Sequence, residues 1–278
     1  MKYIAVLLTV FNRKDKTIQC LTNLYKQALF SDFQLEIFLT NDGCTDGTPE
    51  AVKEQFPNVH IINGNGSLFW NRGMWTAWDA ASHKREYDYY LWLNDDTFIF
   101  EHTLNKLIQS AEFHKNQSII VGATVDSETQ KKITYGGWKK DTLISCNGSD
   151  EEIDYFNGNI VLIPKFAYDI LGNLDYTFTH SKGDFDYGLR AKENNIKMFL
   201  LGEPLGICDL HSSIDSWCNP NIPLRKRIAL LNRPNGMPPK ETFYFEKKHY
   251  GFFLASFHFC TIHLRCIFPR LWIFMGKQ

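Results

Sequence analysis

The fold is decided by residues 3–48, which read YIAVLLTVFNRKDKTIQCLTNLYKQALFSDFQLEIFLTNDGCTDGT. Tyr3–Val10 and Leu35–Thr40 are short, apolar, β-rich runs. Between them the apolar positions recur at helical spacing, so we expect a helix over Asp15–Ala28. A helix between two buried strands predicts a β-α-β unit, in which the two strands lie parallel.

The alternation of strands and helices continues along the chain. Further strands are expected at Val59–Ile62, Tyr89–Leu93, Ser118–Gly122, Lys132–Tyr135, Asn159–Ile163 and Lys197–Leu201. Further helices are expected from Thr48 onward and over Asn71–Ser82, Glu101–His114 and Phe185–Asn194. The pattern predicts an α/β fold with a mostly parallel sheet flanked by helices on both faces.

The composition is that of an ordinary folded protein. The chain has 278 residues, of which 44% are hydrophobic and 22% charged, which excludes a disordered or low-complexity protein. This length suits one large domain or two small ones. The seven cysteines are scattered and contain no CxxC pair, which indicates reduced thiols and a cytoplasmic protein.

Charge is distributed unevenly along the chain. Residues 222–278 carry 10 Lys+Arg and 2 Asp+Glu, a net charge of +8, which leaves 20 and 29, or −9, for residues 1–221. The basic tail is also rich in aromatic residues, which indicates an anionic partner such as a membrane surface. No nucleic-acid-binding motif is visible, so we expect no nucleic acid. The alternative is that the aromatic side chains pack against the first domain or against a second copy of the chain.

Three of the expected strands end in polar groups, namely Asn12-Arg13, Asp42 and Asn94-Asp95-Asp96. Ligands of open parallel sheets bind beyond the carboxyl ends of the strands, although asparagine and aspartate also favour turns. The adjacent carboxylates of Asp95 and Asp96 repel each other, and a hard cation such as Mg²⁺ relieves that repulsion. The alternative is the start of a helix, where acidic side chains are favoured as well.

Five segments, in this order, resemble the motifs of inverting family 2 glycosyltransferases. They are Thr9–Arg13 (TVFNR), Thr40–Thr48 (TNDGCTDGT), Gly64–Gly73 (GNGSLFWNRG), Leu93–Thr97 (LNDDT) and Gly183–Arg190 (GDFDYGLR). The chain is most similar to bacterial enzymes of O-antigen or capsular polysaccharide synthesis, including rhamnosyltransferase-like members. The resemblance implies a GT-A fold, a nucleoside diphosphate sugar as donor, UDP- or dTDP-linked, and a divalent metal, Mn²⁺ or Mg²⁺.

The resemblance also assigns the donor side of the site. The positions that match donor-binding residues are Thr9, Phe11, Asn12, Arg13, Asp42, Asn71, Arg72, Asn94 and Asp95. Asn94-Asp95-Asp96 corresponds to the family's D-x-D motif, with asparagine at its first position. Asp96 then matches the metal-binding carboxylate, and His211 matches a downstream histidine that joins the metal or the diphosphate.

The catalytic base implied by the resemblance is Asp184. The family signature E-D-x-D-x-x-x-R is G-D-F-D-Y-G-L-R here, with Gly183 in place of the glutamate. Inverting transfer needs one carboxylate that takes the proton of the acceptor hydroxyl. Two alternatives are that Asp184 only caps a helix, or that Asp186 is the base. The acceptor region implied by the match comprises Phe156, Asn157, Gly158 and Asp186.

The function implied by the resemblance is sugar transfer to a hydroxyl of a glycan, carried on a polyprenyl diphosphate at the inner face of the plasma membrane. Nucleotidyl transfer to a sugar phosphate is an alternative, but Val10–Arg13 lacks the glycine-rich loop that it needs. A non-catalytic nucleotide- or glycan-binding subunit stays open because Gly183 and Asn94 depart from the motifs.

The expected organisation is a GT-A-like catalytic domain over residues 1–221, followed by an extension. Residues 1–122 would form the nucleotide-sugar-binding part, and residues 123–221 the part that holds the acceptor and the base. The helical, aromatic and basic extension over residues 222–278 would contact the membrane surface, or a second copy in a homodimer.

Overall fold

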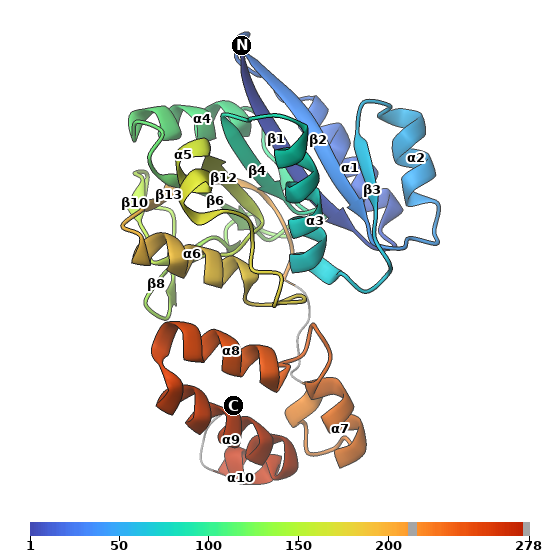
Figure 1. Ribbon diagram of the computed structural model, residues 1–278, viewed down its shortest axis with the longest axis vertical. Coiled ribbons are helices and arrows are strands. Elements are labelled where there is room, and N and C mark those ends of the chain that lie inside the picture. The colour runs from blue at the N-terminus through green and yellow to red at the C-terminus, as the bar shows by residue number, and fades with distance from the viewer. Residues whose placement is uncertain (211–215, 275–278) are drawn as a thin grey trace. The chain divides into compact units, whose positions relative to one another are not determined.

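The computed structural model describes residues 1–210 and 216–274 (Figure 1). Two units divide the chain: Met1–Tyr176 with Gly183–Leu210, and Thr177–Lys182 with the described residues after 210. The last change of unit along the chain follows Leu210. The segment Thr177–Lys182 belongs to the second unit, in which Thr179 donates its backbone N–H and its hydroxyl to Glu241, at 3.0 and 2.6 Å.

The first unit is built on one large sheet. Its strands are β1 (Lys2–Val10), β2 (Phe33–Asn41), β3 (His60–Asn63), β4 (Tyr89–Leu93), β5 (Phe98–Ile99), β6 (Ile119–Val125), β7 (Ile133–Tyr135), β10 (Glu151–Glu152), β12 (Ile160–Pro164) and β13 (Met198–Ile207). The main order is β10-β13-β6-β12-β4-β1-β2-β3. β4, β1, β2 and β3 run parallel, whereas β12 runs antiparallel to β4 and β6. The predicted mostly parallel sheet is confirmed, and β12 is the main departure from it.

Helices cover both faces of this sheet (Figure 1). One face carries α1 (Lys14–Tyr25), α2 (Thr48–Gln55) and α4 (Thr103–Phe113), and the other carries α3 (Phe69–Lys84), α5 (Lys165–Leu171) and α6 (Gly183–Glu193). The strands have apolar side chains for both faces. In β1, Val6 and Leu8 belong to the core under α1, α2 and α4, and Ala5 and Leu7 belong to the core under α3, α5 and α6. Successive side chains of a strand point to opposite faces, so a fully apolar strand can be buried on both sides.

Some details differ from the sequence prediction. The first helix ends at Tyr25 instead of Ala28, and the side chain of Gln27 beyond this end donates to the carbonyl of Phe100 at 2.9 Å. A small antiparallel sheet of β8 (Gly137–Lys139), β9 (Thr142–Leu143) and β11 (Tyr155–Phe156) was not visible in the sequence. Strands of two or three residues are too short to produce a period-2 pattern.

The second unit is helical. It contains α7 (Leu224–Leu231), α8 (Pro239–Tyr250), α9 (Phe252–Ile267), α10 (Pro269–Phe274) and a short 3₁₀ turn over Ser216–Cys218. Its small core includes Trp217, Leu231 and Ile262. The buried Arg227 donates to the carbonyls of Cys266 and Ile267, at 2.8 and 3.2 Å, and so satisfies the carboxyl end of α9. Among the described residues, no helix combines the length and the apolar character that a membrane span requires.

Candidate functional site

The loops that follow β4, β1 and β2 meet at one edge of the sheet. The three strands are adjacent and parallel, with Leu7 opposite Trp92 and Val10 opposite Asn41. Their carboxyl ends therefore point the same way, as the β-α-β pattern predicts. The structure brings together the polar groups that follow these strands in the sequence.

Arg13 lies between two buried carboxylates at this edge. Its Nη1 donates to Oδ2 of Asp96 at 2.7 Å and to Oδ1 of Asp95 at 3.2 Å. Each aspartate is 5% exposed, whereas the Arg13 side chain is 40% exposed. Thr17, one turn further along α1, donates its hydroxyl to the other oxygen of Asp95 at 3.3 Å. Two carboxylates that converge on one nitrogen mark a position where positive charge is stabilised.

Burial changes the acidity of the groups around this position. Burial raises the pKa of Asp95 to about 7, although the charge of Arg13 opposes it. Cys208 has its Sγ 3.9 Å from Oδ1 of Asp96, and burial raises the pKa of its thiol to about 12. Burial therefore favours the protonated form of this thiol at neutral pH.

The carboxylates of Asp95 and Asp96 suit a hard divalent cation, because Mg²⁺ and Mn²⁺ prefer oxygen ligands. Their convergence on the guanidinium nitrogen of Arg13 shows that both can reach one cation. Within the described part of the chain, no cluster of three or more histidine, cysteine, aspartate or glutamate residues could hold a metal ion. The remaining ligands would then be water and a bound diphosphate. His211, the other expected ligand, lies outside the described residues.

Asp42 holds the loop that leads into α3. It is 3% exposed, and its two oxygens accept three backbone N–H groups, from Gly66 at 2.8 Å and from Leu68 and Phe69 at 2.9 Å. A carboxylate is favoured at such a helix start. Gly43 permits the close approach, since its φ is +75° and a Cβ there would lie 2.9 Å from the Cα of Gly66. The predicted contact of Asp42 with a nucleoside stays a prediction.

The first loop is joined to the second by Asn12. Its backbone has φ +51°, a conformation that asparagine tolerates, and its Oδ1 accepts the N–H of Thr45 at 2.8 Å. Phe11 beside it is 53% exposed. Thr9 instead packs against α3, because a Cβ added to Gly73 would lie 2.1 Å from the Thr9 hydroxyl. Thr9 therefore sets how closely α3 approaches β1.

Asn71 and Arg72 contact the chain just before residue 177. The buried Asn71 donates to the carbonyl of Asp175 at 2.9 Å, and Arg72 donates to the carbonyl of Tyr176 at 3.0 Å. A Cβ at Gly183 would lie only 1.7 Å from Oδ1 of Asn71. A glutamate at position 183 is therefore incompatible with Asn71 as it is placed here, which gives the departure from the family signature a steric cause.

Trp70 connects the strand ends to the second half of the unit. Its indole N–H donates to Oδ1 of Asn94 at 2.7 Å. The ring edge lies against Gly158, where an added Cβ would be 2.5 Å from the indole carbon Cζ2. A backbone hydrogen bond joins the same two segments, since the N–H of Asn94 donates to the carbonyl of Asn159 at 3.2 Å. Residues 158 and 159 thus lie directly beside the turn that carries Asp95 and Asp96.

Asp184 adjoins the same group of residues. It lies in the first turn of α6 and is partly exposed, and its Oδ2 accepts the N–H of Gly158 at 3.1 Å. Its other oxygen accepts the N–H of Phe185 at 2.9 Å. Gly158 is hydrogen-bonded to Asp184, and the next residue, Asn159, is hydrogen-bonded to Asn94.

Asp186 is placed quite differently. It is completely buried, and its Oδ2 accepts the Nε–H of Arg190 at 2.9 Å, one turn along α6. Arg190 also donates to the carbonyls of Leu171 and Asn173, at 2.7 and 3.0 Å. The pair ties α6 to the end of α5 and to the segment that follows it, which is a structural arrangement.

Phe156 and Asn157, two of the expected acceptor residues, have partners within this unit. Phe156 is completely buried and packs edge-on against Trp92. Oδ1 of Asn157 accepts the indole N–H of Trp138 at 2.8 Å. Only Gly158 of this segment lies beside Asp184.

Thr17 and Cys208 lie beside Asp95 and Asp96 but were not predicted from the sequence. Thr17 follows Arg13 at the helical spacing of four residues, so a helix starting at Lys14 places both near one another, and that signal was available. Nothing local to Cys208 indicates Asp96, because the two are 112 positions apart and only the sheet brings them together.

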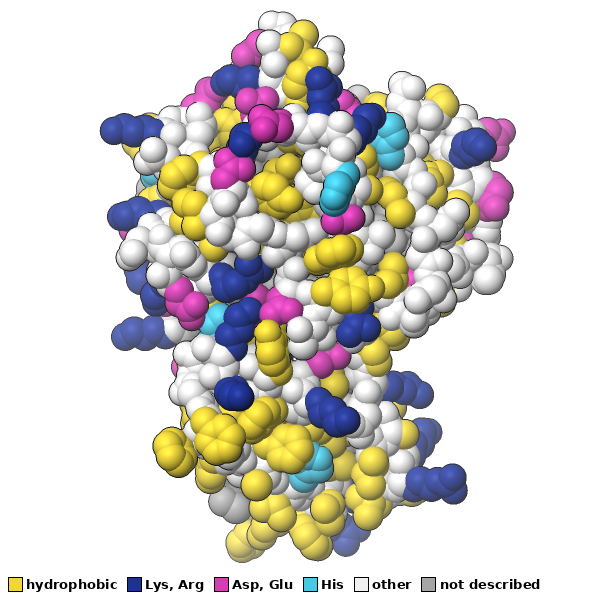
Figure 2. All heavy atoms as spheres, in the orientation of Figure 1, with side chains coloured by type: hydrophobic (Ala, Val, Ile, Leu, Met, Phe, Trp, Pro, Cys, Tyr) yellow, Lys and Arg dark blue, Asp and Glu magenta, His cyan; other side chains and the backbone are white. Residues whose placement is uncertain are grey.

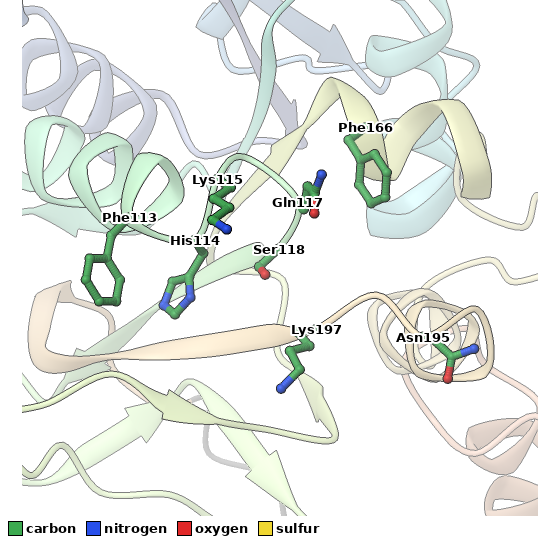
Figure 3. Close-up of a pocket in the computed structure, with 8 residues that line it drawn as sticks. All are labelled: Phe113, His114, Lys115, Gln117, Ser118, Phe166, Asn195 and Lys197. Atoms are coloured by element: carbon green, nitrogen blue, oxygen red, sulfur yellow. The ribbon is translucent and has the colours of Figure 1, made fainter.

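A hollow of about 370 Å³ lies elsewhere on this unit (Figure 3). Its lining includes Phe113 at the end of α4, Ser118 before β6, Phe166 on α5 and Lys197 before β13. β6 and β13 begin at this point, so the hollow lies at the sheet edge opposite to the carboxyl ends of β1, β2 and β4. It takes no part in the site.

Comparison with known proteins gives a family and a fold. The family model described as Glycosyl transferase family 2 matches residues 5–168, more than half of the chain. No curated protein matches the sequence. The mannosyltransferase PcManGT from Pyrobaculum calidifontis, solved with GDP-Man and Mn²⁺, is 13% identical with a TM-score of 0.56, and the match covers 94% of this chain and 73% of that chain.

A second similar structure is S. aureus TarS 1–349 in complex with UDP. It is 15% identical with a TM-score of 0.58, and the match covers 91% of this chain and 72% of that chain. Against a longer TarS structure the identity is 12% and the TM-score 0.56, and this chain spans 44% of its length. At these identities the likeness is one of fold, and the fold is GT-A. Together with the family match, it shows that this chain belongs to glycosyl transferase family 2 and is a nucleotide-sugar-dependent glycosyltransferase.

Proposed function

We propose that the chain transfers a sugar, with inversion, from a nucleoside diphosphate sugar to a hydroxyl of a glycan, and that Asp184 is the general base. The observation that carries this proposal is the position of Asp184, hydrogen-bonded to Gly158 and so next to the turn with Asp95 and Asp96. A base and a diphosphate site must lie close together, because the base takes the proton of the oxygen that attacks the anomeric carbon while the diphosphate leaves that same carbon.

The transfer needs one carboxylate that acts as a base and positive charge that stabilises the leaving diphosphate. Asp184 would take the proton of the acceptor hydroxyl while that oxygen attacks the anomeric carbon and the bond to the diphosphate breaks. Asp95 and Asp96 would hold a divalent cation, Mn²⁺ or Mg²⁺, which when bound neutralises charge on the leaving diphosphate. Arg13 lies at the same place and would add a second positive charge.

The donor class is supported by the neighbours, one of which was solved with GDP-Man and another with UDP. For this chain we propose a UDP- or dTDP-linked donor, a polyprenyl-diphosphate-linked glycan as acceptor, and a cytoplasmic role in bacterial surface polysaccharide synthesis. Calorimetric titration with UDP, dTDP, GDP and CMP, each with and without Mn²⁺, tests the donor site. We expect micromolar binding of one nucleoside diphosphate and tighter binding with Mn²⁺.

Two results would contradict this expectation. Failure of the folded protein to bind any of the four nucleotides would favour a non-catalytic subunit. Nucleotide binding that is unchanged by Mn²⁺ would support the nucleotide site but contradict a metal ion bound by Asp95 and Asp96.

Arg13 is expected to compete with the metal ion for the two carboxylates. Replacing Arg13 with alanine should therefore tighten Mn²⁺ binding to the nucleotide-free protein by about tenfold, since a charged hydrogen bond contributes about 1.5–3 kcal/mol and half-exposed pairs contribute less. Nucleotide binding should weaken in the same variant. Mn²⁺ titration followed by electron paramagnetic resonance measures the first effect without any turnover.

The neighbouring Lys14 provides a matched control, because its side chain is exposed and Lys14→Ala removes the same charge beside the same loop. Equal Mn²⁺ affinities for Arg13→Ala and the native chain would show that Arg13 and the metal do not share a site.

A further inference from the structure

The outer face of α9 and α10 is apolar and exposed. Phe253 is 90% exposed, Phe257 63% and Phe274 89%. Other large apolar side chains exposed on these two helices and the link between them are Phe252, Leu254, Phe259, Leu264, Ile267, Phe268 and Leu271. Figure 2 shows hydrophobic side chains gathered over the helices of this unit, with Lys and Arg side chains among them.

The exposed side chains form a face rather than a scatter. Phe253, Phe257 and Leu264 follow one another at spacings of four and seven residues, which keeps them on one side of α9. The opposite side of α9 is buried in the core of the unit through Ala255, Ile262 and Cys266. The helix therefore has one buried apolar face and a second, exposed face that is also apolar.

The charge around this face is positive. Between Lys247 and Phe274 the sequence has no aspartate or glutamate, and Lys247 and Arg270 are exposed. The two acidic residues of the segment 222–278 lie outside the face: Glu241 accepts from Thr179, and Glu246 faces His258 at 2.9 Å. The segment as a whole carries 10 Lys+Arg and 2 Asp+Glu, a net charge of +8.

This charge decides between the two partners that an apolar face could take. A second copy would bring two segments of +8 together, and their repulsion opposes such a dimer. An anionic bilayer attracts the same segment, by about fivefold in affinity for each basic residue near the lipid headgroups. α9 has 16 residues, fewer than the roughly 20 that a span needs, so it would lie in the plane of the interface.

We propose that α9 and α10 form a docking surface for an anionic phospholipid bilayer, with the phenylalanines inserted shallowly and the basic side chains at the headgroups. Docking does not depend on the proposed transfer reaction, and it can be measured without donor or acceptor.

The test is sedimentation of the full chain with vesicles of phosphatidylcholine alone and of phosphatidylcholine mixed with phosphatidylglycerol. We expect binding to the mixed vesicles at least about tenfold tighter than to the neutral ones, weakened by added salt. The double variant Phe253→Ser/Phe257→Ser should lose at least about tenfold in affinity, because each phenylalanine contributes apolar area. Both side chains are mostly exposed, so the fold should be retained.

A matched control removes two exposed phenylalanines elsewhere, in Phe113→Ser/Phe166→Ser, and should bind like the native chain. A second variant, Lys247→Glu/Arg270→Glu, leaves the apolar face intact and should lose the preference for anionic lipid. Equal binding of the native chain to both vesicle types, or unchanged binding of the Phe253/Phe257 variant, would overturn the proposal. A native dimer in sedimentation velocity that this variant converts to a monomer, without any vesicle binding, would identify the face as a contact between copies.

Discussion

Replacing Asp184 with asparagine is expected to lower the rate of sugar transfer by about 10³-fold, within the range of about 10²–10⁴ that general bases contribute. Asparagine keeps the size of the side chain and still accepts the N–H of Gly158 through its amide oxygen, but its NH2 group cannot accept the N–H of Phe185. It cannot take a proton at neutral pH. Nucleotide affinity should therefore stay near the native value, and the free energy of unfolding should fall by about 1 kcal/mol for the lost hydrogen bond.

The measurement is the initial rate of transfer with the nucleotide sugar identified by calorimetry, alongside nucleotide binding by the same variant. Glu193→Gln, at the exposed end of the same helix, is the matched control and should retain full activity. Native rates in Asp184→Asn would remove Asp184 as the base. Loss of nucleotide binding together with activity would place it on the donor side of the site.

Replacing Asp186 with alanine is expected to act on stability, lowering the free energy of unfolding by about 3–5 kcal/mol. Asp186 is fully buried, and Arg190 is 16% exposed, so the substitution leaves a largely buried guanidinium without its carboxylate. The carbonyls of Leu171 and Asn173 would still accept from Arg190, but neutral acceptors do not balance its charge.

Chemical denaturation measures this effect, with Asp184→Asn as the comparison on the same helix turn. In the double variant Asp186→Ala/Arg190→Met, part of the stability should return, because no unpaired charge remains. A stable, folded Asp186→Ala variant that cannot transfer sugar would indicate that Asp186 is the base and that Asp184 has the structural role.

Much of the fold was predictable because its signals are local. Tyr89–Leu93 was predicted with the limits that β4 has, since a continuous apolar run bounded by polar residues marks a buried strand. The direction of β12 was not predictable. A buried strand has the same pattern in either direction, and its direction depends on the link from β6, which runs through the short strands β7–β11 instead of a helix.

The candidate site was predictable in part for the same reason. Asp95 and Asp96 are adjacent in the sequence, so their mutual repulsion and the need for a cation are visible without a structure. Their partner Arg13 lies 82 and 83 positions away, and the pairing appears only when β1 and β4 become neighbours. Asp42 is a donor-binding match by sequence, while the structure shows it accepting three N–H groups at the start of α3.

The family resemblance, the α/β class and the strand ends where polar groups collect can be read from neighbouring residues, because periodicity and ordered motifs are local properties. The contacts of each polar group depend on how the chain folds. The tertiary structure separates Asp184, beside Gly158 at the strand ends, from Asp186, buried on Arg190, although both lie in one helix turn. Burial and pairing depend on segments distant in the chain, and these segments bury Asp186 against Arg190 and leave Asp184 partly exposed.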